Sequence, residues 1–129
     1  MKQYQQYLTE GKYDGWTKED FWNRYNSTDL AKYCSEYFNI WWDANKFNWY
    51  WSGYLTKFYS KYFNIWWNPD KFDWSWSEWL AIYCSEYFNT WWDADKYNWE
   101  WSNYLVQYCS KYKSIWGADY IKKVLKNEI

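Results

Sequence analysis

The sequence contains no histidine, and its 129 residues include only one proline, four glycines and three cysteines. Without histidine the chain cannot form a Ser-His-Asp triad, lacks the commonest general base and loses most types of zinc site. The glycines stand singly, so there is no glycine-rich loop for binding phosphate. We therefore predict no catalytic residue, no cofactor, no cofactor-binding residue and no metal ligand, and we expect a protein that is not an enzyme.

Long apolar runs and blocks of like charge are also missing. No apolar stretch approaches the ~20 residues that span a bilayer, which predicts no membrane partner. Proteins that bind duplex nucleic acid neutralise its phosphates with excess basic residues. Here 15 basic and 16 acidic residues give a net charge of -1, so we expect no duplex nucleic acid as partner. Residues 1–7 also lack the apolar core of a secretory signal.

The cysteines are too few and too widely spaced for a disulfide scaffold or a metal knuckle. Cys34, Cys84 and Cys109 are separated by 50 and 25 residues, whereas secreted scaffolds and zinc sites use denser patterns. We expect all three to be reduced thiols that fill small apolar positions in the core. This pattern favours a cytoplasmic, intracellular protein.

Aromatic side chains, by contrast, are abundant and recur with a fixed period. The 16 Trp, 17 Tyr and 7 Phe make up 31% of the chain, so they must fill most of any core. Residues 27–51, 52–76 and 77–101 are three full copies of one 25-residue unit, and the first and third agree at 18 of 25 positions. Such a period indicates stacked units. We predict one domain, 1–129, with an N-terminal cap at 1–26 and a truncated copy with a C-terminal cap at 102–129.

Each copy is predicted to begin with a helix of about fifteen residues. Its start is marked by a serine that we expect to cap the helix through its hydroxyl: Ser27, Ser52, Ser77 and Ser102. In the copy 52–76 the apolar residues cover an arc of roughly 200° on a helical wheel. They are Leu55, Phe58, Tyr59, Tyr62, Phe63, Ile65, Trp66 and Trp67. So wide an arc is typical of a helix between two others, and predicts an all-α helical repeat solenoid with degenerate terminal caps.

The last copy supports this interpretation, because two aromatic positions change there. Phe38, Phe63 and Phe88 share one position of the repeat, and Lys113 replaces them in the last copy. Trp42, Trp67 and Trp92 share another, and Gly117 replaces them. Both positions lie on the same edge of the helical wheel. We therefore expect this edge to face the next copy, which the last copy lacks.

The second part of each copy has two interpretations. Asp43, Asn68 and Asp93 look like helix caps, and Pro69 follows in the favoured first position, so we expect one or two helical turns. The alternative is a strand, because the F-x-W-x-W residues 47–51, 72–76 and 97–101 alternate between aromatic and other residues. A strand would make an α/β solenoid. In the flanks, Tyr4, Tyr7 and Leu8 have helical spacing, Thr17 and Asp20 resemble a capping box, and Asp119 is expected to open a last helix.

Tryptophans paired with lysines are the candidate binding surface. Trp49, Trp74 and Trp99 recur every 25 residues beside Lys46, Lys71 and Lys96. Such rings could contact a protein, or could stack with bases of a nucleotide or single strand or with flat faces of a glycan. They could equally fill the core, with lysine over an indole as an internal contact. The leading hypothesis is a structural or interaction module with a protein partner or self-association, and the alternative is a binder of a small aromatic-stacking ligand.

The edge assignment makes a testable prediction. Trp67→Lys would place a charge between two copies, where no water can solvate it, so the array should unfold. Thermal unfolding followed by circular dichroism measures the effect. Full retention of the cooperative transition would contradict the assignment.

Overall fold

The computed structural model describes residues 12–125, and every regular element in that range is a helix or a 3-10 turn. The strand alternative for F-x-W-x-W is therefore wrong. The described residues form two compact units, one ending at Phe47 and one beginning at Asn48. The single domain expected over residues 1–129 stays a prediction, and Tyr4, Tyr7 and Leu8 lie outside the described residues.

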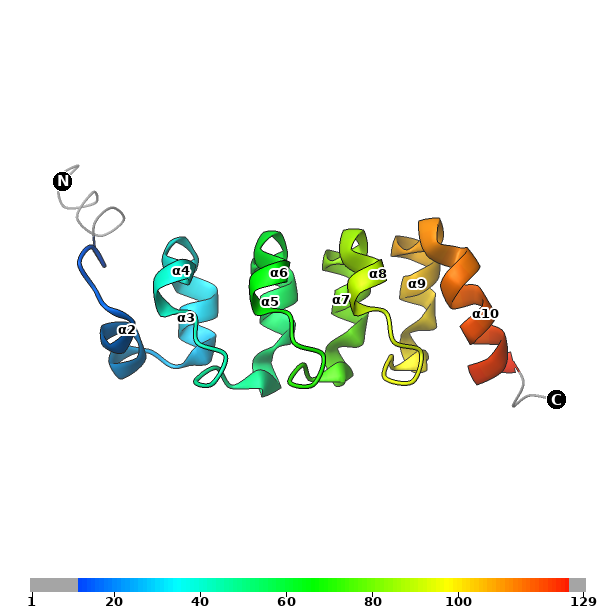
Figure 1. The fold of residues 1–129 in the computed structure, drawn as a ribbon, viewed down its shortest axis with the longest axis horizontal. Coiled ribbons are helices and arrows are strands. Elements are labelled where there is room, and N and C mark those ends of the chain that lie inside the picture. The colour runs from blue at the N-terminus through cyan, green and yellow to red at the C-terminus, as the bar shows by residue number, and fades with distance from the viewer. Residues whose placement is uncertain (1–11, 126–129) are drawn as a thin grey trace. The chain divides into compact units, whose positions relative to one another are not determined.

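The elements follow the copies of the repeat (Figure 1). The N-terminal unit contains α2 (Lys18–Arg24), α3 (Ser27–Tyr33), the 3-10 turn η1 (Ser35–Tyr37) and α4 (Phe38–Trp41). The second unit contains η2 (Trp49–Trp51), α5 (Gly53–Phe58), η3 (Ser60–Tyr62), α6 (Phe63–Trp66), η4 (Trp74–Trp76), α7 (Ser77–Tyr83), η5 (Ser85–Tyr87) and α8 (Phe88–Trp91). It ends with η6 (Trp99–Trp101), α9 (Ser102–Tyr108), η7 (Ser110–Tyr112) and α10 (Lys113–Lys123). None of the helices within residues 12–125 has the length and apolar content needed to cross a membrane.

The long helix expected in each copy is broken after its first two turns, so that prediction is wrong. In the copy 77–101, α7 ends at Tyr83 and Cys84 takes φ -123° and ψ 25°, outside the helical region. The chain then makes one 3-10 turn and resumes as the short helix α8. Cys34, Tyr59 and Cys109 have the same conformation in the other copies.

In each copy a tryptophan of the second helix donates a hydrogen bond to the residue at the break. The indole Nε1–H of Trp91 donates to the carbonyl oxygen of Cys84, seven residues earlier, over 2.7 Å. Trp66 donates to Tyr59 over 2.7 Å in the preceding copy. Trp41 and Trp116 make the same bond to Cys34 and Cys109, both over 2.8 Å. We call this the corner hydrogen bond. All four tryptophans are buried, where an indole N–H requires an acceptor.

The serines that open the three full copies are buried, and the helix-capping role predicted for Ser52 and Ser77 is wrong. The Ser52 hydroxyl accepts a hydrogen bond from the backbone N–H of Asp73 over 2.9 Å. The Ser77 hydroxyl accepts one from Asn98, also over 2.9 Å. Each serine therefore ties the beginning of a copy to its end. No side-chain cap is found at the start of α9, and α3 is capped by Asn26 instead of Ser27.

The second part of each copy is a turn followed by a 3-10 turn, so the predicted short helix is also wrong. The carboxylate of Asp93 accepts from the backbone N–H of Asp95 over 3.0 Å, and Asn68 accepts from Asp70 in the same way. These side chains close a turn as expected of a cap, but the helix does not continue. Asn98 then caps η6 by accepting from Glu100.

Neighbouring copies of the second unit pack through aromatic pairs, with α7 between α5 and α9 (Figure 1). Phe63 stacks on Tyr87 of the next copy, with ring centroids 4.6 Å apart. Phe88 stacks on Tyr112 at the same distance. Phe63 and Phe88 therefore face the next copy, as predicted. All four residues are aromatic because the helices are short and rings must span the gap.

The flanking segments give one confirmed and one wrong prediction. Thr17 and Asp20 form the predicted capping box at the start of α2, with reciprocal bonds of 2.8 and 3.1 Å. Asp119 does not open a helix, because α10 runs through it without a break. Its carboxylate instead accepts a hydrogen bond from the indole of Trp92 over 2.9 Å.

The corner hydrogen bond predicts a stability difference between two tryptophan variants. Trp66→Phe keeps a ring in the core but removes the indole hydrogen bond to the carbonyl of Tyr59, which keeps its bond from the backbone N–H of Tyr62. The lost hydrogen bond and the smaller ring together should cost about 1–3 kcal/mol. Trp74 is the matched control, because its indole donates to the exposed carbonyl of Pro69, which water can solvate. Urea unfolding of both variants measures the difference. Equal losses would contradict the importance of the corner bond.

Candidate functional site

The tryptophans predicted to bind a ligand are half-buried, and Trp74 and Trp99 pack against rings of the array. The Trp74 ring lies 5.7 Å from that of Trp67, edge to face, and its indole donates to Pro69. The Trp99 ring contacts Trp92 at 5.6 Å, and its indole donates to Ala94 over 2.9 Å. Trp49 lies at the start of the second unit and is also half-buried. A ligand would therefore meet only part of each ring.

The lysines of this predicted surface, Lys46, Lys71 and Lys96, are exposed. Lys96 does not lie over Trp99 of its own copy. Its ammonium lies 5.9 Å from the ring centroid of Trp74 in the preceding copy, and 3.7 Å from the carboxylate of Asp70. The structure thus joins a lysine with a tryptophan as an internal cation-π contact. Their role in ligand binding stays a prediction.

A different row of aromatic residues is exposed in every copy of the second unit. Phe58, Tyr83 and Tyr108 end the helices α5, α7 and α9, and they are 39%, 36% and 40% exposed. They occupy one position of the repeat. Tyr33 holds that position in the N-terminal unit and is 73% exposed. An aromatic ring is therefore exposed at the same place on each of three neighbouring helices.

Two further rows of half-buried rings lie beside these exposed residues. Tyr54 stacks on Phe58 at 6.0 Å, and Tyr104 stacks on Tyr108 at 6.2 Å. Tyr54 also contacts Trp79 of the next copy at 6.0 Å. We call these nine residues the aromatic face: Trp51, Tyr54, Phe58, Trp76, Trp79, Tyr83, Trp101, Tyr104 and Tyr108.

Gly53 allows one of these rings to approach the backbone. A Cβ atom at position 53 would lie 2.5 Å from Cδ2 of Trp76, closer than any real contact. Trp76 in turn contacts Trp79 at 4.8 Å, and its indole donates to the carbonyl of Tyr50 over 2.8 Å. The close approach brings the rings of one copy against those of the next. Lys57 is the charge nearest the surface, 5.4 Å from the Phe58 ring and 5.8 Å from that of Trp79.

The sequence indicates this face through one aromatic position of the repeat, but a helical wheel drawn for a continuous helix makes that position look buried. Positions 33, 58, 83 and 108 are Tyr, Phe, Tyr and Tyr. On a continuous fifteen-residue helix, Phe58 falls inside the apolar arc and looks buried. The break at the following residue ends the helix there, so Phe58 points to solvent. Ile65, placed in the same arc, is 56% exposed for the same reason.

Burial is the main cause of the shifted pKa values of the three cysteine thiols. Burial raises the pKa of the Cys84 and Cys109 thiols to about 12, and it raises that of Cys34 as well. All three cysteines are free and buried, as predicted. Their thiolate forms are therefore scarce at neutral pH. Across residues 12–125, no three cysteine or carboxylate side chains come together to hold a metal ion.

Glu78, in the first turn of α7, is the one side chain in residues 12–125 with a buried polar atom that makes no hydrogen bond. Burial raises the pKa of its carboxyl above the ordinary value. The nearby hydroxyl of Tyr97 is bonded to the carbonyl of Trp101 over 2.8 Å, and burial also raises its pKa, with a smaller contribution from the Glu78 charge. The Glu78 carboxylate therefore costs stability when it is ionised.

Searches against protein families, curated proteins and solved structures found no match for this chain.

The buried carboxyl of Glu78 predicts a pH-dependent effect. The pKa of this group is higher in the folded chain than in the unfolded chain, so its penalty is absent below the unfolded pKa, grows as pH rises from that value to the raised one, and is complete above it. Glu78→Gln should raise the unfolding midpoint at pH 7 and leave it nearly unchanged at pH 4. Glu86→Gln, an exposed carboxylate in the same copy, is the control. A loss of stability in Glu78→Gln at pH 7 would contradict this assignment.

Proposed function

We propose that this chain is a non-enzymatic tandem-repeat module whose copies stack as a 25-residue helical solenoid and whose aromatic face binds protein. Support for the stacking comes from contacts that recur from one pair of copies to the next. The thiol of Cys84 lies 3.8 Å from the carbonyl oxygen of Thr56, and the thiol of Cys109 lies 3.8 Å from that of Ala81. The Phe63–Tyr87 and Phe88–Tyr112 stacks repeat in the same way. Equivalent contacts at a fixed spacing are the basis of solenoid architecture.

The aromatic face is the observation that carries the binding proposal. Exposed contiguous apolar surface on a folded protein favours an interaction site. Tyrosine and tryptophan are also the residues most enriched among the energetic centres of protein interfaces. Here Tyr83 and Tyr108 stand exposed on a rigid base of packed rings, which reduces the entropy lost on binding. The partner is another protein or a second copy of this chain.

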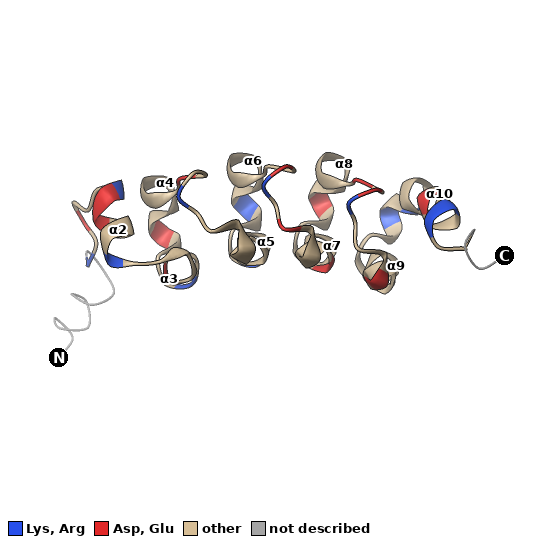
Figure 2. Ribbon diagram, turned by 90° about the horizontal axis from the view of Figure 1, so that it is seen from below, with Lys and Arg blue, Asp and Glu red and all other residues tan. Residues whose placement is uncertain are grey.

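The distribution of charged residues favours a protein over a nucleic acid as the partner. Figure 2 shows acidic and basic residues interspersed along the ribbon, with no basic stripe of the kind that follows a phosphate backbone. Lys57 is the lysine placed over rings of the aromatic face, through contacts to Phe58 and Trp79. One lysine gives little neutralisation of a strand of phosphates.

The second candidate function is binding of a nucleotide, single strand or glycan by stacked rings. The observation in its favour is the combination of indole and ammonium groups at Lys96 and Trp74. The packing of Trp74 and Trp99 against rings of the array counts against it, because less ring area is available for a ligand. Quenching or shift of tryptophan fluorescence on titration with an oligonucleotide or oligosaccharide would support this candidate.

One substitution on the aromatic face tests the leading proposal. Tyr83→Lys places a charge at the centre of the face, where the side chain is exposed enough for the fold to persist. We expect at least about tenfold weaker association, a loss of about 1.4 kcal/mol. Asn89→Lys, an exposed position on α8, adds the same charge away from the face and should have no effect. Light scattering over a concentration series measures self-association, and pull-down with each variant measures capture of other proteins.

The proposal fails if the wild-type chain is monomeric throughout and captures no protein in a manner sensitive to Tyr83→Lys. If fluorescence titration under the same conditions gives saturable binding of an oligonucleotide or oligosaccharide, the second candidate replaces it.

A further inference from the structure

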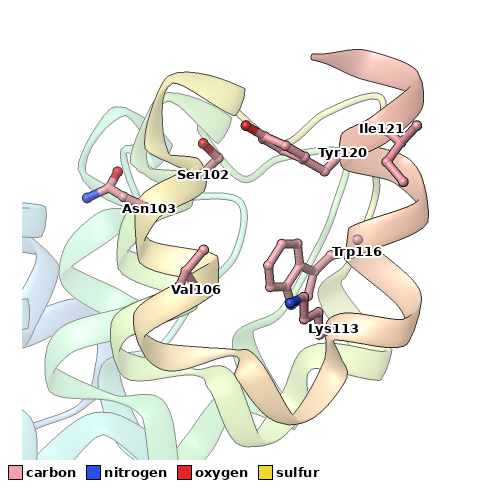
Figure 3. Close-up of a pocket in the computed structure, with 8 residues that line it drawn as sticks. Ser102, Asn103, Val106, Lys113, Trp116, Tyr120 and Ile121 are labelled. Atoms are coloured by element: carbon pink, nitrogen blue, oxygen red, sulfur yellow. The ribbon is translucent and has the colours of Figure 1, made fainter. Parts of the chain in front are cut away.

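A groove opens between α9 and α10 in the last copy. Its volume is about 520 Å³. Figure 3 shows Val106 of α9 facing the indole of Trp116 on α10, with the ring of Tyr120 across one end. The remaining lining residues are Ser102, Asn103, Lys113, Gly117 and Ile121. The lining is mainly apolar, with a lysine at one margin.

The corresponding position is filled in the two preceding copies. Thr56 and Ala81 occupy the position of Val106 in the repeat, and both are fully buried, whereas Val106 is 62% exposed. The cysteine of the following copy covers each of them, because Cys84 contacts the carbonyl of Thr56 and Cys109 that of Ala81. The groove is therefore a continuation of the interface between α5 and α7 and between α7 and α9, left open after α9.

The occupant of the filled positions has a defined chemistry. Each filled position is occupied by a short amphipathic helix and the 3-10 turn that follows it. The small residue lies between the helix and the turn, and a tyrosine follows three residues later. In the copy 77–101 these are Cys84 and Tyr87, and Tyr87 stacks on Phe63 at 4.6 Å. A partner that fits the open groove should present the same arrangement of residues.

Charge distinguishes the open groove from the filled ones. Lys113 stands where Phe63 and Phe88 stand in earlier copies. Four lysines and one aspartate lie between residues 102 and 125, and Lys111, Lys113 and Lys122 form no ion pair with any described residue. In Figure 2 this end of the chain shows lysines on α10. A partner with carboxylates beside its apolar stripe complements this charge.

The surface of a copy that packs onto the preceding copy carries the tyrosine equivalent to Tyr87. In the N-terminal unit this surface is already covered. The ring of Tyr37, at the position of Tyr87, contacts Tyr13 at 5.4 Å and Phe21 at 5.7 Å. Within residues 12–125, a second copy of the chain therefore offers no matching bare surface at this end of the repeat, which favours a different protein as the occupant.

From this geometry we propose that the groove between α9 and α10 is a docking site for an acidic amphipathic helix of a partner protein, which takes the place of a further copy of the repeat. The inference rests on the proposed interaction function, and it assigns a second surface distinct from the aromatic face. Apolar contact with Val106 and Trp116 positions the partner helix, and carboxylates of that helix near Lys113 provide specificity.

A peptide from the chain itself is a suitable probe. A peptide with the sequence of residues 77–91, with Cys84 replaced by alanine, contains Glu78 and Glu86 and carries a net charge of -2 from its side chains. A peptide with the sequence of residues 52–66 has the same register but contains Lys57 and Lys61, for a net +2. We expect the full chain to bind the acidic peptide at least about tenfold more tightly, as measured by anisotropy of a labelled peptide.

Variants of the full chain locate the binding. Val106→Glu puts a carboxylate into the groove at an exposed position and should weaken binding of the acidic peptide at least tenfold. Gln107→Glu adds the same charge at the neighbouring exposed residue, outside the groove, and should not. Lys113→Glu should reverse the preference between the two peptides. The thermal transition of each variant checks that it is folded.

Three results would overturn the docking site: equal binding of both peptides, unchanged binding by Val106→Glu, or binding to anionic phosphatidylserine vesicles that the acidic peptide does not displace. The last would identify a lipid surface. Tyr83→Lys separates this site from the aromatic face, because it should leave peptide binding intact while it weakens association through the face.

Discussion

The corner hydrogen bond is the interaction on which the rest of each copy depends. At each break the buried carbonyl accepts the backbone N–H of the tyrosine three residues later, as Cys84 does from Tyr87. The same carbonyl accepts a second hydrogen bond, from the indole of Trp41, Trp66, Trp91 or Trp116 seven residues further along. The group that depends on this bond is the buried indole N–H, which would be costly to leave without an acceptor.

Two consequences follow from the corner. The first helix of each copy is short, so its last residue turns to solvent, and an aromatic residue stands there in all four copies. The second helix is redirected, so that Phe63 and Phe88 meet tyrosines of the next copy face to face. The same break thus produces both the exposed aromatic face and the packing between copies.

The aromatic content divides accordingly into rings that hold copies together and rings that remain available. Trp66, Phe63 and Trp91 are fully enclosed, and Trp74 and Trp99 are half-buried against neighbours. Phe58, Tyr83 and Tyr108 remain exposed over a packed base. The groove beside Val106 has a different origin, because it arises where the stack ends and no further copy covers α9. Both proposed surfaces therefore result from the repeat. The aromatic face is formed by equivalent positions of successive copies, and the groove lies at the last copy.

The sequence alone determined the helical class, the 25-residue period, the buried cysteines, the capping box at Thr17 and the direction in which Phe63 and Phe88 face, because periodicity and residue chemistry are local properties. It did not reveal the corner, since Trp66 reaches a carbonyl seven residues away and no propensity records that bond. Nor did it reveal that Ser52 and Ser77 bond to residues 21 positions later. The tertiary structure decided which rings are exposed, because the break at Tyr59 ends the helix after Phe58 and leaves in solvent a ring that a continuous helix would place in the buried arc.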